Sequence, residues 1–395
     1  MRVLLFLCVL SGCFKPSYDH PACGPNRECP SGFSCNTQDV CERPGGGDDD
    51  AFVPKDSNST TDTPPGAYCL GSSGGLFVAC FPTAPTGALS ISSNLDTGIA
   101  NPMCDAVASN ASVCVVASGQ ITVPGGALVR VTGPRALVLA SASTMTMVGT
   151  LDLGSTSGSP GAGSALVACP AGNPPQDDPN GAGGGAGGSF VQRGAPGAAG
   201  TGLGGAPGAS IAAVTMLRGG CSGQDGGAGT GSRAQRGAGG GGVYLVAATS
   251  IVISGTITAG GQGGEGGMSS GPRSGGAGGG SGGVIGLDAP TVTVTGAVLA
   301  GGGGGGEGSG QAPGASGQNA GAARNPAAGG AGVSTSGGDG GNGGYSTTLP
   351  TAGMTGSLGG GGLGGGGGGG GGVGVIKVVP AGALSGGGVV APPPS

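Results

Sequence analysis

The feature that most constrains the fold of this chain is an internal repeat that aligns without a gap. Residues 241–261, GGVYLVAATSIVISGTITAGG, match residues 282–302, GGVIGLDAPTVTVTGAVLAGG. A third copy at 136–155, ALVLASASTMTMVGTLDLGS, has the same register, and residues 371–379 repeat only the first part before Pro380 ends the match. Repetition of this kind is typical of proteins that stack one structural unit on the next.

Apolar and polar side chains alternate with a period of two within each copy, which indicates β-strands. Single strands of this length cannot bury their apolar face, but stacked copies can. The alignment would place equivalent residues one above another, about 4.8 Å apart, in internal ladders. The expected ladders are Met145, Ile251 and Val292, and Leu151, Ile257 and Val298. The pattern therefore predicts an all-β fold, a right-handed parallel β-helix-like solenoid.

Glycine, at 104 of 395 positions, is concentrated between these copies, in residues 156–240, 262–281 and 303–370. Each glycine adds no side chain to a core and loses much backbone entropy on ordering. We expect these stretches to be long glycine-rich insertions between coils. The insertions of repeat proteins tend to emerge on one face, which is often the binding face. The alternative is that they are disordered loops.

The first residues have the order of a secretory signal, with Arg2 followed by an apolar run that is too short to span a bilayer. The Leu-Ser-Gly-Cys ending at Cys13 resembles the lipobox of bacterial lipoproteins. The resemblance implies that residues 1–12 are cleaved and that acylated Cys13 anchors the chain in a membrane. In such lipoproteins an aspartate after the cysteine implies retention in the inner membrane. Phe14 stands at this position, so the resemblance implies the outer membrane. The alternative is an ordinary cleaved signal in which Cys13 is incidental.

The remaining cysteines of an exported chain are expected to form disulfides. Their six-residue spacing near the N-terminus does not fit a zinc site, so no metal is expected. Pairing within each group of four stays open. The cysteines concerned are Cys23, Cys29, Cys35, Cys41, Cys69, Cys80, Cys104, Cys114, Cys169 and Cys221.

Composition predicts five successive regions. The acidic, Pro-, Ser- and Thr-rich stretch is typical of a disordered linker. The regions are a signal peptide at 1–12, a lipid-anchored cysteine-rich module at 13–44, the linker at 45–66, a cysteine-containing β entry region at 67–135, and the glycine-rich β-solenoid at 136–395.

The sequence offers little for catalysis, and we expect neither an enzyme nor a cofactor. Glycoside hydrolysis ordinarily needs two carboxylates on one face. The candidates are Asp152, Asp288 and the adjacent pair Asp177 and Asp178, and solvated turns are the simpler interpretation for all of them. His20, the single histidine, lies in the cysteine-rich module, across the linker from the repeats.

The charge pattern does not favour nucleic acid as a partner. The net charge is −5, and the arginines form no basic stripe with interleaved aromatics. Arg218, Arg233 and Arg236 could meet on one loop, although solvated surface charge is the expected role for each. Asp225 and Asp339 are isolated and lack the fixed period of a calcium-binding repeat.

Glycine tracts such as GGDGGNGG at 337–344 are similar to the glycine-rich repeats of PE-PGRS surface proteins, although the helical N-terminal module of those proteins is missing. The order of lipobox, cysteine module, acidic linker and glycine-interrupted β-coils looks like that of glycine-rich, cysteine-containing surface lipoproteins of the myxobacterial type. This resemblance implies a structural or adhesive role at the cell surface, with the membrane, extracellular polysaccharide or other surface proteins as partners.

Two alternative functions remain open. Parallel β-helices commonly host polysaccharide-binding or polysaccharide-cleaving proteins, although a fold alone does not establish an activity. The other alternative is a self-associating envelope or matrix protein, in which the glycine segments pack as extended polyglycine-II-like rods.

Overall fold

The computed structural model describes residues 28–29, 34–35, 41–42, 67–105, 108–164, 168–268, 273–359 and 362–395. The chain divides into two compact units, Met1–Thr61 and Asp62–Ser395. The predicted signal peptide, Cys13, His20, Cys23 and the predicted linker at 45–66 lie outside the described residues. In the first unit, β1 (Ser34–Cys35) pairs antiparallel with β2 (Cys41–Glu42), and a disulfide joins Cys29 to Cys41.

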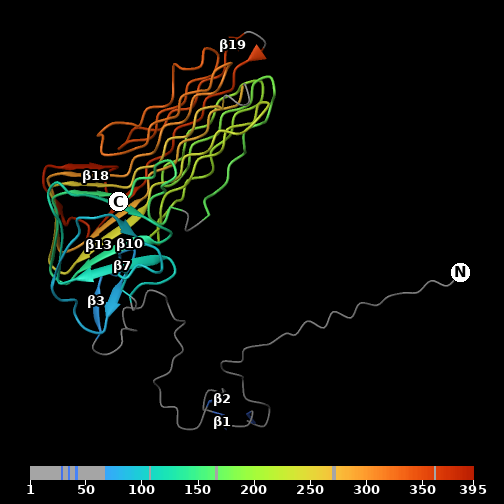
Figure 1. Cartoon of the computed structure of the whole chain (residues 1–395). Coiled ribbons are helices and arrows are strands. Elements are labelled where there is room, and N and C mark those ends of the chain that lie inside the picture. The colour runs from blue at the N-terminus through green and yellow to red at the C-terminus, as the bar shows by residue number, and fades with distance from the viewer. Residues whose placement is uncertain are drawn as a thin grey trace. The chain divides into compact units, whose positions relative to one another are not determined.

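The second unit is built around three parallel sheets, and the described residues contain no helix (Figure 1). The chain visits the sheets in turn, so that each complete coil contributes one strand to each sheet. The first sheet holds β7 (Val113–Ser118), β10 (Ala136–Ser141), β13 (Gly242–Ala247), β16 (Val284–Asp288) and β21 (Val375–Val379). The second holds β5 (Ala88–Ser90), β8 (Gln120–Val123), β11 (Thr144–Met147), β14 (Ser250–Ile253), β17 (Thr291–Val294) and β22 (Leu384–Ser385). The third holds β6 (Leu95–Asp96), β9 (Leu128–Thr132), β12 (Thr150–Asp152), β15 (Thr256–Thr258), β18 (Ala297–Leu299) and β23 (Val389–Ala391). The first coil, with β5 and β6, contributes only to the second and third sheets.

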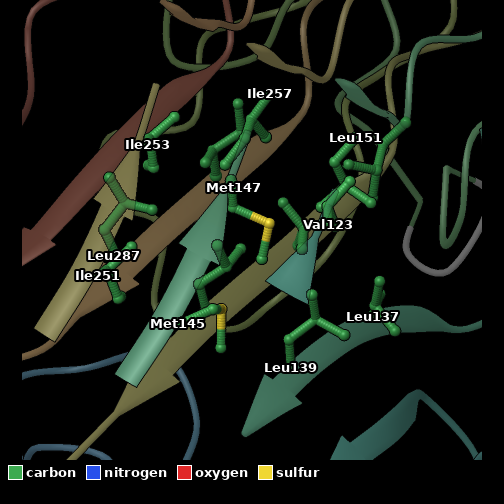
Figure 2. Packing of buried hydrophobic residues seen from close by; sticks show 14 of the residues in the cluster. Val123, Leu137, Leu139, Met145, Met147, Leu151, Ile251, Ile253, Ile257 and Leu287 are labelled. Carbon is green, nitrogen blue, oxygen red and sulfur yellow. The ribbon is translucent and has the colours of Figure 1, made fainter. Parts of the chain in front are cut away.

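The predicted all-β fold of stacked parallel strands is confirmed, as are both internal ladders. Met145 is in register with Ile251, which is in register with Val292. Leu151, Ile257 and Val298 align in the same way. These side chains are almost fully buried and meet in one core between the sheets (Figure 2). Stacking therefore buries a continuous aliphatic interior that no single coil could form.

The first sheet is buried on its outer face as well. An antiparallel hairpin, β3 (Tyr68–Leu70) and β4 (Ala79–Phe81), contributes Leu70 and Phe81 to a second apolar cluster with Val138 and Tyr244. Disulfides fasten this region and the coil beside it, joining Cys69 to Cys80 and Cys104 to Cys114. The sequence left this pairing open, and each bond proves to join cysteines that are neighbours along the chain.

The glycine-rich segments run between the third strand of one coil and the first strand of the next. They occupy residues 153–241, 259–283 and 300–374 in the element order. Figure 1 shows them leaving the strands as a sheaf of near-parallel runs, with β19 (Leu358–Gly359) at its far end. There β19 pairs antiparallel with β20 (Gly362–Leu363).

These runs are ordered by hydrogen bonds to one another at every third residue. Gly366, Gly369 and Gly372 donate N–H bonds of 2.9–3.0 Å to the carbonyls of Ala182, Gly185 and Gly188. A three-residue period without bonds inside the segment is the geometry of the polyproline-II helix. The described residues within 172–241, 259–283 and 300–374, called the glycine-rich bundle below, thus pack in the polyglycine-II manner within one molecule.

Candidate binding end of the glycine-rich bundle

The run at 364–372 lies inside the glycine-rich bundle and is glycine throughout. A Cβ on Gly366, Gly367 or Gly368 would lie 2.0 Å from the carbonyl oxygen of Ala198, Asp339 or Ala277, which belong to three different neighbouring segments. Each of the three directions around the helix is therefore closed by backbone. The segments hydrogen-bonded to this run are 182–188, 195–198, 276–282, 303–309, 338–344 and 351–357.

Runs at the sides of the bundle follow a Gly-Gly-x pattern in which the third residue faces outward. Gln262 and Glu265 occupy this position in one run, and Asp339 and Asn342 in another. Several of these side chains accept hydrogen bonds from backbone N–H groups that face away from the interior. Gln262 Oε1 accepts from Ala238 N at 3.2 Å, and Asn342 Oδ1 from Gly329 N at 3.0 Å. The polar residues therefore cap the surface of the bundle, as buried or half-buried N–H groups require.

Turns at 178–181, 200–203, 228–234, 309–313, 331–336 and 357–359 form the outer end of the bundle, opposite the strands. Glu307, which is fully buried, fixes two of them. Its Oε2 accepts from Ala315 N and Val333 N at 2.9 and 3.2 Å, and its Oε1 accepts from Ser334 N at 2.8 Å. A buried carboxylate is tolerated only when hydrogen-bonded in this way. Buried hydrogen bonds to Glu307 consequently fix two turns of the outer end.

Several large apolar side chains are exposed at this end. Leu203, Val333 and Leu358 are 62%, 56% and 84% exposed and come from three different turns. Met354, 62% exposed, lies one turn of the extended helix before Ser357. Exposed apolar residues gathered on an ordered surface mark interaction sites more often than single scattered ones do. These residues were not predicted from the sequence; the available signal was an isolated large hydrophobic residue inside a glycine- or serine-rich stretch.

The structure does not bring the carboxylates considered for catalysis together. Asp152 in the third sheet forms an ion pair with Arg130, at 2.8 Å. Asp288 in the first sheet is buried and accepts hydrogen bonds from Tyr244 Oη and Ser72 Oγ, both at 2.6 Å. Each of these carboxylates therefore holds neighbouring strands or the covering hairpin in place.

The remaining candidates, the adjacent residues Asp177 and Asp178, lie near the outer end. Asp177 Oδ2 lies 2.5 Å from Arg233 Nη2, and Asp178 Oδ1 accepts from Asn180 N at 2.7 Å. The two side chains thus fix a salt bridge and a turn, the ordinary roles of surface carboxylates.

Two groups in the second unit have shifted pKa values because of burial. Burial raises the pKa of Tyr244 well above its usual range, and the hydrogen bond to Asp288 adds to the shift. Burial also lowers the pKa of Arg218. The guanidinium of Arg218 lies 5.4 Å from the ring centre of Phe190, so the expectation of a solvated surface role for this arginine is wrong.

Within the described ranges, no group of three His, Cys, Asp or Glu residues is placed to hold a metal ion. The same residues include no helix long and apolar enough to cross a membrane.

No family model, curated protein or solved structure matches this chain.

Proposed function

We propose that this chain is a non-catalytic, lipid-anchored cell-surface protein whose glycine-rich bundle makes adhesive contacts through its outer end. The supporting observation is the set of exposed apolar residues at this end, Leu203, Val333, Met354 and Leu358. Buried hydrogen bonds to Glu307 fix the turn that carries Val333. Rigid turns lose little conformational entropy on binding, which favours affinity. The lipobox-like sequence ending at Cys13 supports export and anchoring in the outer membrane.

The proposal also includes the hand of the solenoid and the place of the glycine-rich segments in it. The solenoid is right-handed, because parallel crossover connections have this hand in about 98% of cases. The glycine-rich segments are insertions between its coils, since each lies between a third-sheet strand and the next first-sheet strand. All of them therefore leave the coil at the same corner, which directs the bundle away from the strands.

Adhesion is tested with the full-length chain produced with its own signal in a Gram-negative host. Cells carrying the double variant Leu203→Asp/Leu358→Asp are compared with wild type for retention under flow on apolar, hydrophilic and cell-coated surfaces. The matched control is Leu128→Asp, a similarly exposed leucine (63%) on β9, which belongs to the third sheet and not to the glycine-rich bundle. We expect a tenfold or greater loss of retention for the double variant alone, and equal retention of all three contradicts the proposed adhesive role.

Anchoring is tested separately through Cys13. Wild-type chains should incorporate labelled fatty acid, sediment with outer membranes and be accessible to protease on intact cells. Cys13→Ser should abolish labelling and release the chain from the membrane fraction. A Cys13→Ser chain that stays membrane-bound, or a wild-type chain without label, refutes the lipid anchor while leaving the adhesion result to be judged by itself.

A further inference from the structure

A cavity of about 540 Å³ opens along the side of the glycine-rich bundle. It is lined by residues 187–189, by parts of 169–175 and by residues 220–225. The disulfide between Cys169 and Cys221 joins the last two segments. This volume lies in the range of about 300–1,000 Å³ that is typical of ligand sites. We call this cavity the side groove.

Backbone N–H groups reach the side groove in a three-residue series. Gly183 N donates to the carbonyl of Gln176 at 3.0 Å, and Ala186 N donates to Gln224 Oε1 at 3.1 Å. The next member is Ser189, which lines the groove and is only 4% exposed. Among the described residues, its N–H has no acceptor. An N–H group buried in this way is complementary to a carbonyl that the groove lacks.

The facing segment has a donor series of the same spacing, whose member in the groove, Ser222, is exposed. Gly219 N donates to Gly163 O at 3.0 Å, and Ala228 N donates to Asp177 Oδ1 at 2.8 Å. Ser222 lies in the same three-residue series, lines the groove, and its N–H has no acceptor in the part of the chain that the structure describes. Two segments thus offer donors to one cavity.

In the part of the neighbouring segment that the structure describes, no group supplies the missing partner. Residues 170–172 pack instead against 206–208, where a Cβ on Gly208 would lie 2.0 Å from Pro170 O. The Gln224 side chain spans the gap toward the outer end, and its Nε2 donates to Asn173 O at 3.1 Å and Ala206 O at 3.0 Å. A further extended segment could lie beside the runs that carry Ser189 and Ser222. The part of this place nearer the strands is left empty by the described residues and forms the groove.

The lining also indicates what kind of ligand fits. The charges at the rim are already paired, Arg233 with Asp177 at 2.5 Å and Arg236 with Asp225 at 3.9 Å. The residues that line the groove include no aromatic ring on which a sugar could stack. Elsewhere in the bundle, runs such as 182–188 and 364–372 bond mainly to other extended backbone segments.

We propose that the side groove binds an extended, uncharged, glycine-rich segment of another polypeptide in the polyproline-II conformation. Its carbonyls accept hydrogen bonds from Ser189 N and Ser222 N, so that it adds one more run to the bundle. This is the polyglycine-II counterpart of β-strand addition at a sheet edge. The interaction is a second function of the bundle and does not depend on adhesion by its outer end.

The test titrates ¹⁵N-labelled full-length chain with an acetylated, amidated peptide of three Gly-Gly-Asn repeats. We expect saturable shifts of the Ser189 and Ser222 amides, with Gly341 unmoved. Ser222→Pro removes one donor and suits a polyproline-II backbone, where φ is already near the proline value. Losing one hydrogen bond should weaken peptide binding about 3- to 10-fold. Ala352→Pro, on the exposed run 351–357, is the matched control and should bind as wild type does.

Three results overturn the proposal. One is no peptide binding at millimolar concentration, and another is shifts confined to residues outside the groove. The third is stronger perturbation of the same amides by dextran or by polyaspartate, which assigns the groove to sugars or to anions. Should Ser222→Pro disturb the fold, as circular dichroism would reveal, the Ser189 shift in the wild-type chain still decides the matter.

Discussion

Single glycines in the bundle are required by the space around them. Gly368, for example, does not have a positive φ, but a Cβ there would lie 2.0 Å from Ala277 O. No rotation of a side chain relieves such a contact, because the backbone fixes the position of the Cβ and the oxygen belongs to the backbone of Ala277. Substitution must therefore push two segments apart and strain the hydrogen bonds on either side.

Gly368→Ala should lower the free energy of unfolding by about 1–3 kcal/mol, the usual cost of overpacking an interior. Gly321→Ala is the control, because a Cβ at Gly321 has no atom within 4 Å. Denaturant unfolding of both variants measures the difference. Equal stabilities would show that the central run is not packed as described.

Tyr244 links stability to alkaline pH. Its pKa is raised by burial and by the hydrogen bond to Asp288, so the folded chain keeps a proton that the unfolded chain releases above about pH 10. The stabilisation is complete below that pH and is lost as pH rises further. We expect the free energy of unfolding to fall more steeply above about pH 10 in wild type than in Tyr244→Phe, as urea titrations across this range can measure. Parallel curves contradict the buried phenol.

Along a strand of the second sheet, adjacent side chains alternate between the buried core and the solvent. On β14, Ile251 is fully buried and Val252 is 37% exposed. Ile251→Ala should cost about 2–5 kcal/mol of stability through the cavity it leaves. Val252→Ala should change stability by no more than about 0.5 kcal/mol. Thermal or denaturant unfolding distinguishes them, and a reversed order would require the register of this strand to slip by one residue.

The disulfides differ in the length of chain that they close. Cys169 and Cys221 are separated by 52 residues, whereas Cys69 and Cys80 are separated by 11. The chain-entropy model predicts a loss of about 4 kcal/mol when the long loop is opened and about 3 kcal/mol for the short one. The double serine variants of each pair, unfolded in denaturant, should show this order, and a larger loss for the hairpin would point to its packing on the first sheet instead.

The sequence predicted the strands and their stacking because the information is local. Alternation marked the inward residues of each strand, and the gap-free repeat set Met145 beside Ile251 and Val292. The order of the glycine-rich bundle could not be predicted in the same way. Gly366 bonds to Ala182 across most of the repeat region, and neither residue has a side chain that identifies its partner.

The candidate site was hidden for the same reason. Leu203 and Leu358 lie in turns far apart in sequence, and only the packing of the runs brings those turns to one end of the bundle. The Gly-Gly-x pattern in tracts such as 337–344 can be seen in the sequence. That every third residue faces outward follows only once the segments packed against the two glycines are known.

For the whole second unit, the glycine-rich bundle should be as resistant to local opening as the solenoid. Backbone amides in 276–282 and 365–371 bond to other segments rather than to water. Hydrogen exchange, corrected for the fast intrinsic exchange of glycine, should give these amides opening free energies close to those of β13. Exchange at the rate of an unstructured peptide would mean that the runs are not ordered in solution.

The out-and-back course of the runs restricts how a protein of this design can change in length during evolution. Lengthening the sheaf by one helical turn takes three residues in every run at once, whereas thickening it takes runs in pairs, because each excursion must come back to its coil. Point substitution at outward positions has no such restriction. In related proteins, the side chains at outward positions are therefore expected to vary much faster than the length or the thickness of the bundle.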